Sequence, residues 1–406
     1  MQQGDLLRSF KTQAVFNNHP LFSFLSTAIG RVASTDESWM RLLPAGLGAT
    51  TVALFAWWAA RRYGWHAAVG GAAVLATTPV FVGEVRQARG YAIVVFCALV
   101  ASILLVDQVR SRIGRIVYVL AIAIAVSTHL YVLLVVLAHA GFVIARRPVD
   151  VKRLVGMGLG VGLGGLAYVG LWRSMLDASE ERGHRYRPSF GEDAARELLG
   201  GGGLAMVMLL IPLGLAAWHL ARRREVVLGL GLPLAAVFVV WQVQQPTDLY
   251  VRFLIAAAIP TAAGVAWAVH HRGWMFPIAL VAAVLALVDQ LDEYREEPPV
   301  RQAAQYVAGA RALGLRPCAM GFPAIGAYTE PPVRYTKISQ VPDCDVVVQV
   351  NTFGDERMEA LKAAYPYDWT FLHQRIVSVV PREELERGFD NSGFSLPSRR
   401  TSASDS

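Results

Sequence analysis

The sequence predicts an all-α polytopic membrane bundle of about ten transmembrane helices, followed by a small C-terminal α/β domain on the exoplasmic side. Of its 406 residues, 54% are hydrophobic and only 17% are charged, whereas soluble chains usually carry about 25% charged residues. The deficit lies in long apolar runs. Because a helix rises about 1.5 Å per residue, about 20 apolar residues cross a hydrocarbon core of ~30 Å.

The apolar runs locate the expected helices. The runs of near-spanning length are 42–60, 66–83, 90–106, 154–172, 204–220, 226–243, 252–269 and 274–291. The apolar stretch 115–147 is longer than one comfortable span and short for two. Since the loops before and after it are both basic, it has to return to the side on which it starts. We therefore expect two short helices there, with a turn near residues 127–129.

Loop charge sets the expected orientation. Thirteen Lys or Arg and only three Asp or Glu lie in the loops 61–65, 107–115, 146–153, 221–225 and 270–273, whereas eight of each lie in 84–90, 173–203 and 244–252. Basic loops stay cytoplasmic, so both chain ends are expected outside and the protein is expected in the plasma (inner) membrane. The basic loops expected on the cytoplasmic side then account for the net charge of +7. No further positive charge is left to indicate a nucleic-acid partner.

Four regions are expected along the chain. They are an exoplasmic segment 1–41, a transmembrane domain 42–291 with an exoplasmic loop 173–203, an exoplasmic α/β domain 292–390 and a disordered tail 391–406. The loop is long enough to indicate a function. The alternative is a solvated connector that contains a short amphipathic helix around residues 192–199.

The α/β domain is predicted from a change of periodicity. Helical patterns occupy 299–314, 355–366 and 381–388, and strand patterns occupy 344–350 and 370–380, the latter as one strand or two. Cys318 and Cys344 both fall in this domain, where either a disulfide or two unpaired thiols fit the sequence. A disulfide would stabilise the domain by roughly 3–4 kcal/mol.

The first group of polar residues beside the apolar runs lies between two expected spans on the outer face. It contains Glu84, Arg86, Arg89 and Tyr91. Arginine carries a planar fork of donors that suits phosphate. Two arginines three residues apart fit one side of a helical turn and would clamp a lipid phosphate. The alternative is interfacial snorkelling, with Tyr91 in an aromatic belt.

Two further polar groups lie at expected helix ends. His129 and Tyr131 fall at the turn between the two short helices, where backbone at membrane depth lines protein or water. His129 is either a substrate-binding group or a packed core histidine. Asp248, Tyr250 and Arg252 begin another span. The positive charge of Arg252 opposes the helix dipole, which hints at an anionic partner.

Asp36 and Glu37 resemble paired catalytic carboxylates, but Ser34 to Glu37 fits a helix capping box, which we prefer. The motifs HExxH, CxxC, GxxxxGK(S/T) and GxSxG are absent from the sequence. Zinc-protease, ATP-driven and serine-hydrolase functions therefore lack support. No motif supports a metal site, so the cofactor is unknown and a divalent metal stays open.

Taken together, the polar motifs resemble a known family. In chain order they are His19-Pro20-Leu21, Glu37-Ser38-Trp39-Met40-Arg41, Arg86-Gln87-Ala88-Arg89-Gly90-Tyr91, Thr128-His129-Leu130-Tyr131, and Tyr250-Val251-Arg252 with Ile259-Pro260. Their order and the topology resemble the GT-C fold glycosyltransferases over residues 15–270. The nearest pattern is that of bacterial protein O-mannosyltransferases and lipid A aminoarabinose transferases.

This resemblance implies a reaction and roles for named residues. The enzyme would move a sugar from a polyprenyl-phosphate donor to an envelope glycan, lipid or protein on the exoplasmic face. Arg86, Arg89 and Arg252 would hold the donor phosphate, and Glu84 is a lesser candidate for acid/base work. The residues implied to line the cavity are His19, Tyr91, His129 and Tyr250.

The chain departs from the family pattern at its beginning. In the family the general base is a carboxylate soon after the first transmembrane helix, whereas Asp5 is the only acid before His19 here and lies in no recognisable copy of that motif. Residues 1–41 are also expected outside without a helix to export them. We therefore expect the first helix and the catalytic loop to be missing, which would impair this chain as an enzyme.

Other functions also fit the sequence. A polymerase or ligase of surface polysaccharide would place its catalytic residues in the long outer loop, at Arg182, His184, Arg185 and Arg187. A transporter usually shows inverted repeats and interrupted helices, which the sequence does not reveal. The last alternative is a noncatalytic membrane anchor.

Overall fold

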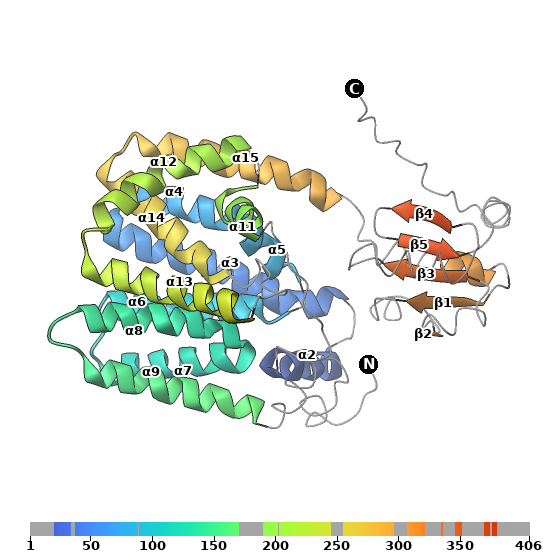
Figure 1. Cartoon of the computed structure of the whole chain (residues 1–406), viewed down its shortest axis with the longest axis horizontal. Helices are drawn as coiled ribbons and strands as arrows, with labels where there is room; N and C mark the ends of the chain where they lie inside the picture. The colour runs from blue at the N-terminus through green and yellow to red at the C-terminus, as the bar shows by residue number, and fades with distance from the viewer. Residues whose placement is uncertain are drawn as a thin grey trace. The chain divides into compact units, whose positions relative to one another are not determined.

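The computed structural model describes residues 20–33, 37–87, 89–169, 190–201, 203–244, 255–295, 307–312, 314, 316–320, 334–335, 346–350, 369–373 and 376–379. The chain divides into two compact units, a helical unit that ends at Asp292 and a second unit that begins at Glu293. Figure 1 shows the helices and strands of both.

The helical unit contains a helix in every apolar run that the sequence predicts. In chain order the elements are α2 (Pro20–Val32), α3 (Glu37–Tyr63), α4 (Trp65–Thr77), α5 (Pro79–Val85), α6 (Tyr91–Val106), α7 (Arg112–Thr128), η1 (Leu130–Val132), α8 (Leu133–Ala145), α9 (Val151–Gly165), η2 (Leu166–Tyr168), α11 (Phe190–Leu199), α12 (Gly203–Leu220), α13 (Arg224–Gln244), α14 (Ala258–His271) and α15 (Met275–Arg295).

Several boundaries differ from the expectation. α3 begins at Glu37, so its first turn lies inside the segment expected to precede the transmembrane domain. α2 was not predicted, and it packs on α7 and α3. The stretch 115–147 does contain two short helices, α7 and α8, separated at His129 as the loop charges require.

Fewer helices than predicted are long enough to span a membrane. Within the described residues, the part of α3 from Trp39 to Tyr63 and α12 are long and apolar enough to cross a bilayer. α4 and α5 qualify together as a pair bent by 61°, so the run 66–83, expected as one helix, is broken. α6, the η1–α8 segment and the part of α15 from Met275 to Leu291 are apolar but shorter.

α9 illustrates the surface of these helices. Its outward positions Val155, Leu159 and Leu163 are exposed and apolar, and its inward positions Met157 and Gly160 are buried. A helix that is apolar on both faces is typical of a membrane span or of the core of a large protein. The outward face of α9 therefore fits contact with lipid.

Glycines allow the helices to pack closely. A Cβ added to Gly160 of α9 would lie 2.9 Å from Ile122 of α7, and one added to Gly164 would lie 2.7 Å from the Val126 Cβ. Likewise, a Cβ on Gly71 of α4 would lie 2.9 Å from the carbonyl oxygen of Ala262 in α14. Small residues at four-residue spacing are the usual means of close helix approach in membranes.

The second unit contains a five-stranded sheet. The strands are β1 (Pro317–Met320), β2 (Arg334–Tyr335), β3 (Val346–Val350), β4 (Trp369–His373) and β5 (Ile376–Val379). Their order is β2-β1-β3-β5-β4. β2, β1 and β3 are parallel, with Cys318 opposite Val347, while β5 is antiparallel to both β3 and β4.

The sheet can be compared with the sequence patterns. β3 lies in the predicted strand 344–350, and the pattern 370–380 forms two strands, β4 and β5. Residues 307–312 are helical, within the predicted helix 299–314. The predicted helices 355–366 and 381–388 lie outside the described residues. Cys318 is disulfide-bonded; Cys344 lies outside the described residues, so its pairing stays a prediction.

Candidate functional site

The first part of the candidate site is the break between α4 and α5. Thr78 adopts an extended conformation, and Pro79 occupies the first position of α5, where its missing N–H does no harm. The broken helix leaves carbonyl groups at the end of α4 without helical donors. Gln290 of α15 supplies one, because its side-chain amide donates to the Thr77 carbonyl at 2.7 Å.

The turn from α5 to α6 carries the predicted phosphate-binding residues. Glu84, in the last turn of α5, is only 8% exposed. Arg86 caps the helix and is exposed, Arg89 is half-buried, and Tyr91 begins α6 with 3% exposure. Buried and solvent-facing charges thus lie within two helical turns of chain.

The break between α7 and η1 meets this turn. His129 is 3% exposed and extended, with φ −160° and ψ 131°. Its ring lies 5.3 Å from that of Tyr91 and 5.0 Å from that of Tyr131, between centroids. The structure therefore brings two of the three predicted motifs together. We call the end of the bundle that contains Tyr91 and His129 the outer end.

The hydrogen bonding of His129 fixes its neutral tautomer. Its Nδ1 atom accepts the backbone N–H of Tyr131 at 3.2 Å. An accepting Nδ1 carries no hydrogen, so the neutral ring carries its hydrogen on Nε2. His129 can therefore offer a hydrogen-bond donor from the Nε2 side of the ring.

Arg41 is a further candidate site residue, which belongs to one of the sequence motifs but received no role there. Gly48 packs closely on α5, since an added Cβ would lie 3.0 Å from the Val85 Cβ. Arg41 precedes Gly48 by two helical turns and therefore lies on the same face of α3, at the outer end. Its Nε atom is buried. The sequence feature that could have identified Arg41 as a site residue is a charged side chain in the first turns of an apolar helix.

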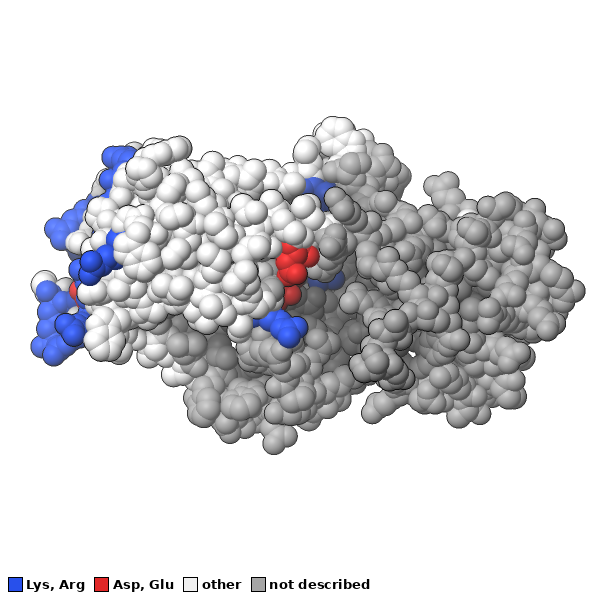
Figure 2. Space-filling view, turned by 90° about the horizontal axis from the view of Figure 1, so that it is seen from above, with Lys and Arg blue, Asp and Glu red and all other residues white. Residues whose placement is uncertain are grey.

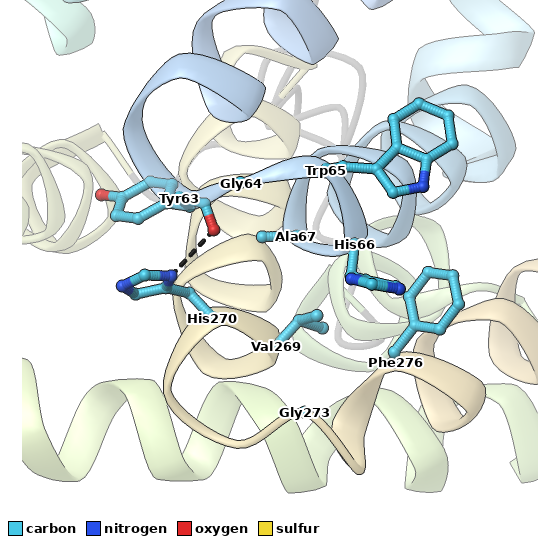
Figure 3. Close-up of a pocket in the computed structure, with 9 residues that line it drawn as sticks. All are labelled: Tyr63, Gly64, Trp65, His66, Ala67, Val269, His270, Gly273 and Phe276. Carbon is cyan, nitrogen blue, oxygen red and sulfur yellow. Dashed lines mark hydrogen bonds between the residues drawn. The ribbon is translucent and has the colours of Figure 1, made fainter.

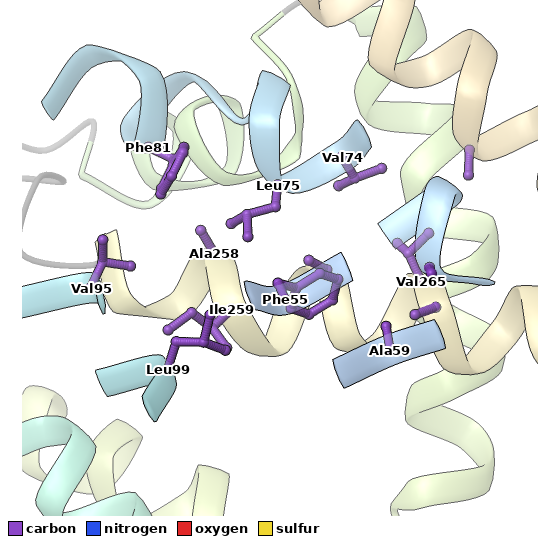
Figure 4. Close-up of a cluster of buried hydrophobic side chains, with 14 of the residues drawn as sticks. Phe55, Ala59, Val74, Leu75, Phe81, Val95, Leu99, Ala258, Ile259 and Val265 are labelled. Atoms are coloured by element: carbon purple, nitrogen blue, oxygen red, sulfur yellow. The ribbon is translucent and has the colours of Figure 1, made fainter. Parts of the chain in front are cut away.

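α14 follows the third motif in the sequence and begins in the core. Ala258 and Ile259 lie among Val95 and Leu99 of α6 and Phe81 of α5 (Figure 4). The predicted site residues Asp248, Tyr250 and Arg252 lie before this point and outside the described residues, as do His19 and the loop residues Arg182, His184, Arg185 and Arg187. Their roles stay predictions.

The opposite end of the helical unit is basic, and we call it the basic end. Asp107 follows α6 and pairs with Arg62 at 3.1 Å, while the indole of Trp58 donates to the same carboxylate oxygen at 3.3 Å. Arg153 donates to the Leu105 carbonyl at 2.9 Å. Figure 2 shows Lys and Arg side chains gathered at this end. α6 separates the two ends by about 22 Å.

A buried polar cluster that the sequence did not reveal links three helices. The ring nitrogens of His139 in α8 lie 3.0 Å from the Ser102 hydroxyl of α6 and 3.0 Å from the Tyr118 hydroxyl of α7. Hydrogen bonds between helices hold membrane bundles together. Within the described residues there is no group of three or more His, Cys, Asp or Glu suited to a metal ion.

Broken helices with polar turns at one end and basic loops at the other are typical of a polytopic membrane protein, and the likeness to two solved structures supports a GT-C-like fold. Among solved structures, the chain is similar to ArnT from Cupriavidus metallidurans in the apo state. The TM-score is 0.56 at 14% identity, with 91% of this chain and 88% of that chain covered.

The same protein bound to undecaprenyl phosphate is also similar. Its TM-score is 0.52 at 13% identity, with 89% of this chain and 87% of that chain covered. At this level of identity the likeness concerns the fold. No protein-family model matches the chain, and no curated protein matches it significantly.

Proposed function

We propose that this protein is a multi-pass glycosyltransferase of the plasma (inner) membrane that takes a sugar from a polyprenyl-phosphate donor. The acceptor would be an envelope glycan, lipid or protein on the exoplasmic face. The observation that carries the proposal is the meeting of the α5–α6 turn with His129 at the outer end, in a fold similar to that of ArnT bound to undecaprenyl phosphate.

The proposal includes ten membrane crossings. They are α3, α4 with α5, α6, α7, α8, α9, α12, α13, α14 and α15. The helices shorter than a full span would cross with their flanking residues at the level of the lipid headgroups. Basic loops on the cytoplasmic side orient the bundle, and an even number of crossings puts the second unit on the exoplasmic side.

The chemistry follows from the leaving group. The acceptor oxygen attacks the anomeric carbon of the sugar, the bond from that carbon to the phosphate oxygen breaks, and polyprenyl phosphate leaves. Arg86 and Arg89 would stabilise the phosphate charge, with Arg252 as a third predicted contact. The proton of the acceptor hydroxyl goes to a carboxylate. Glu84 is the buried carboxylate of this turn and a weaker candidate for that base.

Binding of the lipid carrier tests the proposal without depending on turnover. Purified protein in detergent would be titrated with undecaprenyl phosphate and the bound lipid counted by native mass spectrometry. We expect Arg86→Ala and Arg89→Ala each to weaken binding about tenfold or more, because a charge-assisted hydrogen bond contributes roughly 1.5–3 kcal/mol. Arg115→Ala at the basic end is the matched control and should bind normally.

Other outcomes would favour the alternatives. Equal affinity for the lipid in the unaltered protein and all three variants would contradict phosphate binding at this turn. Loss of transfer on alanine substitution of Arg182, His184, Arg185 and Arg187, with Arg86 and Arg252 dispensable, would favour a polysaccharide ligase. Flux of substrate across proteoliposomes without a covalent product would favour a transporter.

A further inference from the structure

The basic end contains a pocket that the proposed reaction does not use. It has a volume of about 450 Å³ and lies between the α3–α4 turn and the α14–α15 turn. Figure 3 shows Tyr63 and Gly64 from the first turn on one side, and His270, Gly273 and Phe276 from the second on the other. The outer end, where the transferase chemistry is proposed, is at the other end of the bundle.

Two imidazole rings, His66 and His270, belong to the pocket wall. His270 Nδ1 lies 2.8 Å from the backbone carbonyl oxygen of Tyr63. Since a carbonyl oxygen only accepts, Nδ1 carries the hydrogen, and a protonated ring adds a second donor at Nε2. His66 packs edge-on against Phe276, with ring centroids 5.2 Å apart. No aspartate or glutamate is among the residues that line the pocket.

The surroundings of the pocket are positively charged. Arg272 is exposed and lies in the chain between the lining residues His270 and Gly273. Arg61, just before the first turn, lies over the Trp57 ring at 4.9 Å. α4 begins beside the pocket at Trp65, and its N-cap Gly64 provides no side-chain hydrogen bond. The positive end of the α4 dipole therefore adds to the field of the arginines.

Exposed tryptophans place the pocket at the level of the lipid headgroups. Trp65 is 70% exposed and Trp274 is 58% exposed, one on each turn that forms the pocket. Tryptophan gathers at membrane–water interfaces, where its ring is apolar on one side and wet on the other. Outward apolar residues of α15, such as Val281 and Val284, continue from the pocket along the helix. A soluble anion would not need this apolar surface.

We propose that this pocket binds the phosphate headgroup of an anionic lipid in the leaflet on the basic side of the protein, with the acyl chains along α15. His66 and His270 line the pocket, Arg272 lies next to it in the chain, and Trp65 and Trp274 lie on its two turns. Basic pockets between helices on the cytoplasmic side suit such headgroups. The site is separate from donor binding and requires only that the helical unit lies in a membrane.

Lipid retention tests the proposal independently of any transfer activity. The full-length protein would be purified from vesicles of phosphatidylcholine with and without phosphatidylglycerol, and the co-purified lipid counted by native mass spectrometry. We expect one phosphatidylglycerol per chain. The combined variant His66→Ala/His270→Ala/Arg272→Gln should reduce retention about fivefold or more, because each basic group near an anionic membrane surface strengthens binding to it.

Two further variants keep the test decisive. Gly273→Phe should fill the pocket without a clash at its Cβ, which has open space around it, and should also lose the lipid. His219→Ala combined with Arg115→Gln removes the same kinds of side chain from the basic end outside the pocket and should retain it. Equal retention in all variants, or equal loss in the control, would overturn the proposal. Displacement of the lipid by millimolar inorganic phosphate would identify a soluble phosphate site instead.

Discussion

The rings of Tyr91 and His129 lie 5.3 Å apart between centroids and are tilted by 32°. Tyr91 begins α6, and His129 interrupts the α7–α8 hairpin. A buried ring pair of this kind contributes about 0.5–1.5 kcal/mol beyond burial. This contact therefore ties the arginine-bearing α5–α6 turn to the second helical hairpin and fixes the geometry of the outer end.

Truncation of Tyr91 should destabilise the bundle. Because the ring is 3% exposed, Tyr91→Ala leaves a cavity and is expected to lower the free energy of unfolding by about 3 kcal/mol. Tyr91→Phe keeps the ring contact and should cost clearly less. Reversible unfolding in mixed detergent micelles, followed by tryptophan fluorescence, measures both. Equal losses in the two variants would show that the hydroxyl group, and not ring packing, holds the turn.

The cluster of Ser102, Tyr118 and His139 should stabilise the α6–α7–α8 packing. His139→Leu removes both hydrogen bonds while keeping similar volume, and we expect a loss of about 1–3 kcal/mol. Ser102→Ala removes only one bond and should cost clearly less. The same unfolding measurement distinguishes them. An unchanged free energy of unfolding in His139→Leu would mean that the Ser102 and Tyr118 hydroxyl groups find other hydrogen-bond partners inside the bundle.

Two glycines of α9 provide a matched pair of substitutions that tests helix packing. A Cβ at Gly164 would overlap the Ala123 carbonyl and lie 2.7 Å from the Val126 Cβ, whereas one at Gly158 has open space. Gly164→Ala should therefore lower stability by about 1–3 kcal/mol. Gly158→Ala should raise it by up to about 1 kcal/mol, as expected for glycine in a helix. The opposite order of the two changes would contradict the observed α7–α9 contact.

Fusion reporters can test the proposed crossings. Green fluorescent protein should fluoresce when fused within 107–115 and also within 146–153, because α7 and α8 together return to the same side. Alkaline phosphatase should be active at the C-terminus, which ten crossings place outside. Opposite reports from the first two fusions would mean that residues 116–145 cross only once, and the count would fall to nine.

Much of the helical unit could be predicted from the sequence. Long apolar runs and basic loops are local properties, so each run identified helical chain, and loop charge led to the prediction of two short helices with a turn near residues 127–129, where α7 ends. In the second unit the run of valines identified β3. β1 and β2 were missed because Pro317–Met320 and Arg334–Tyr335 are too short to show an alternating pattern.

The contacts between helices were decided only by the tertiary structure. In a membrane, the face of a helix that meets lipid and the face that meets protein are both apolar, so hydrophobic periodicity cannot show which side faces inward. The sequence therefore identified Tyr91 and His129 as separate motifs but not as a ring pair. It also could not place His139 between Ser102 and Tyr118 or bring His270 to the Tyr63 carbonyl. Those contacts depend on how closely the helices approach, which glycines such as Gly71 and Gly164 permit.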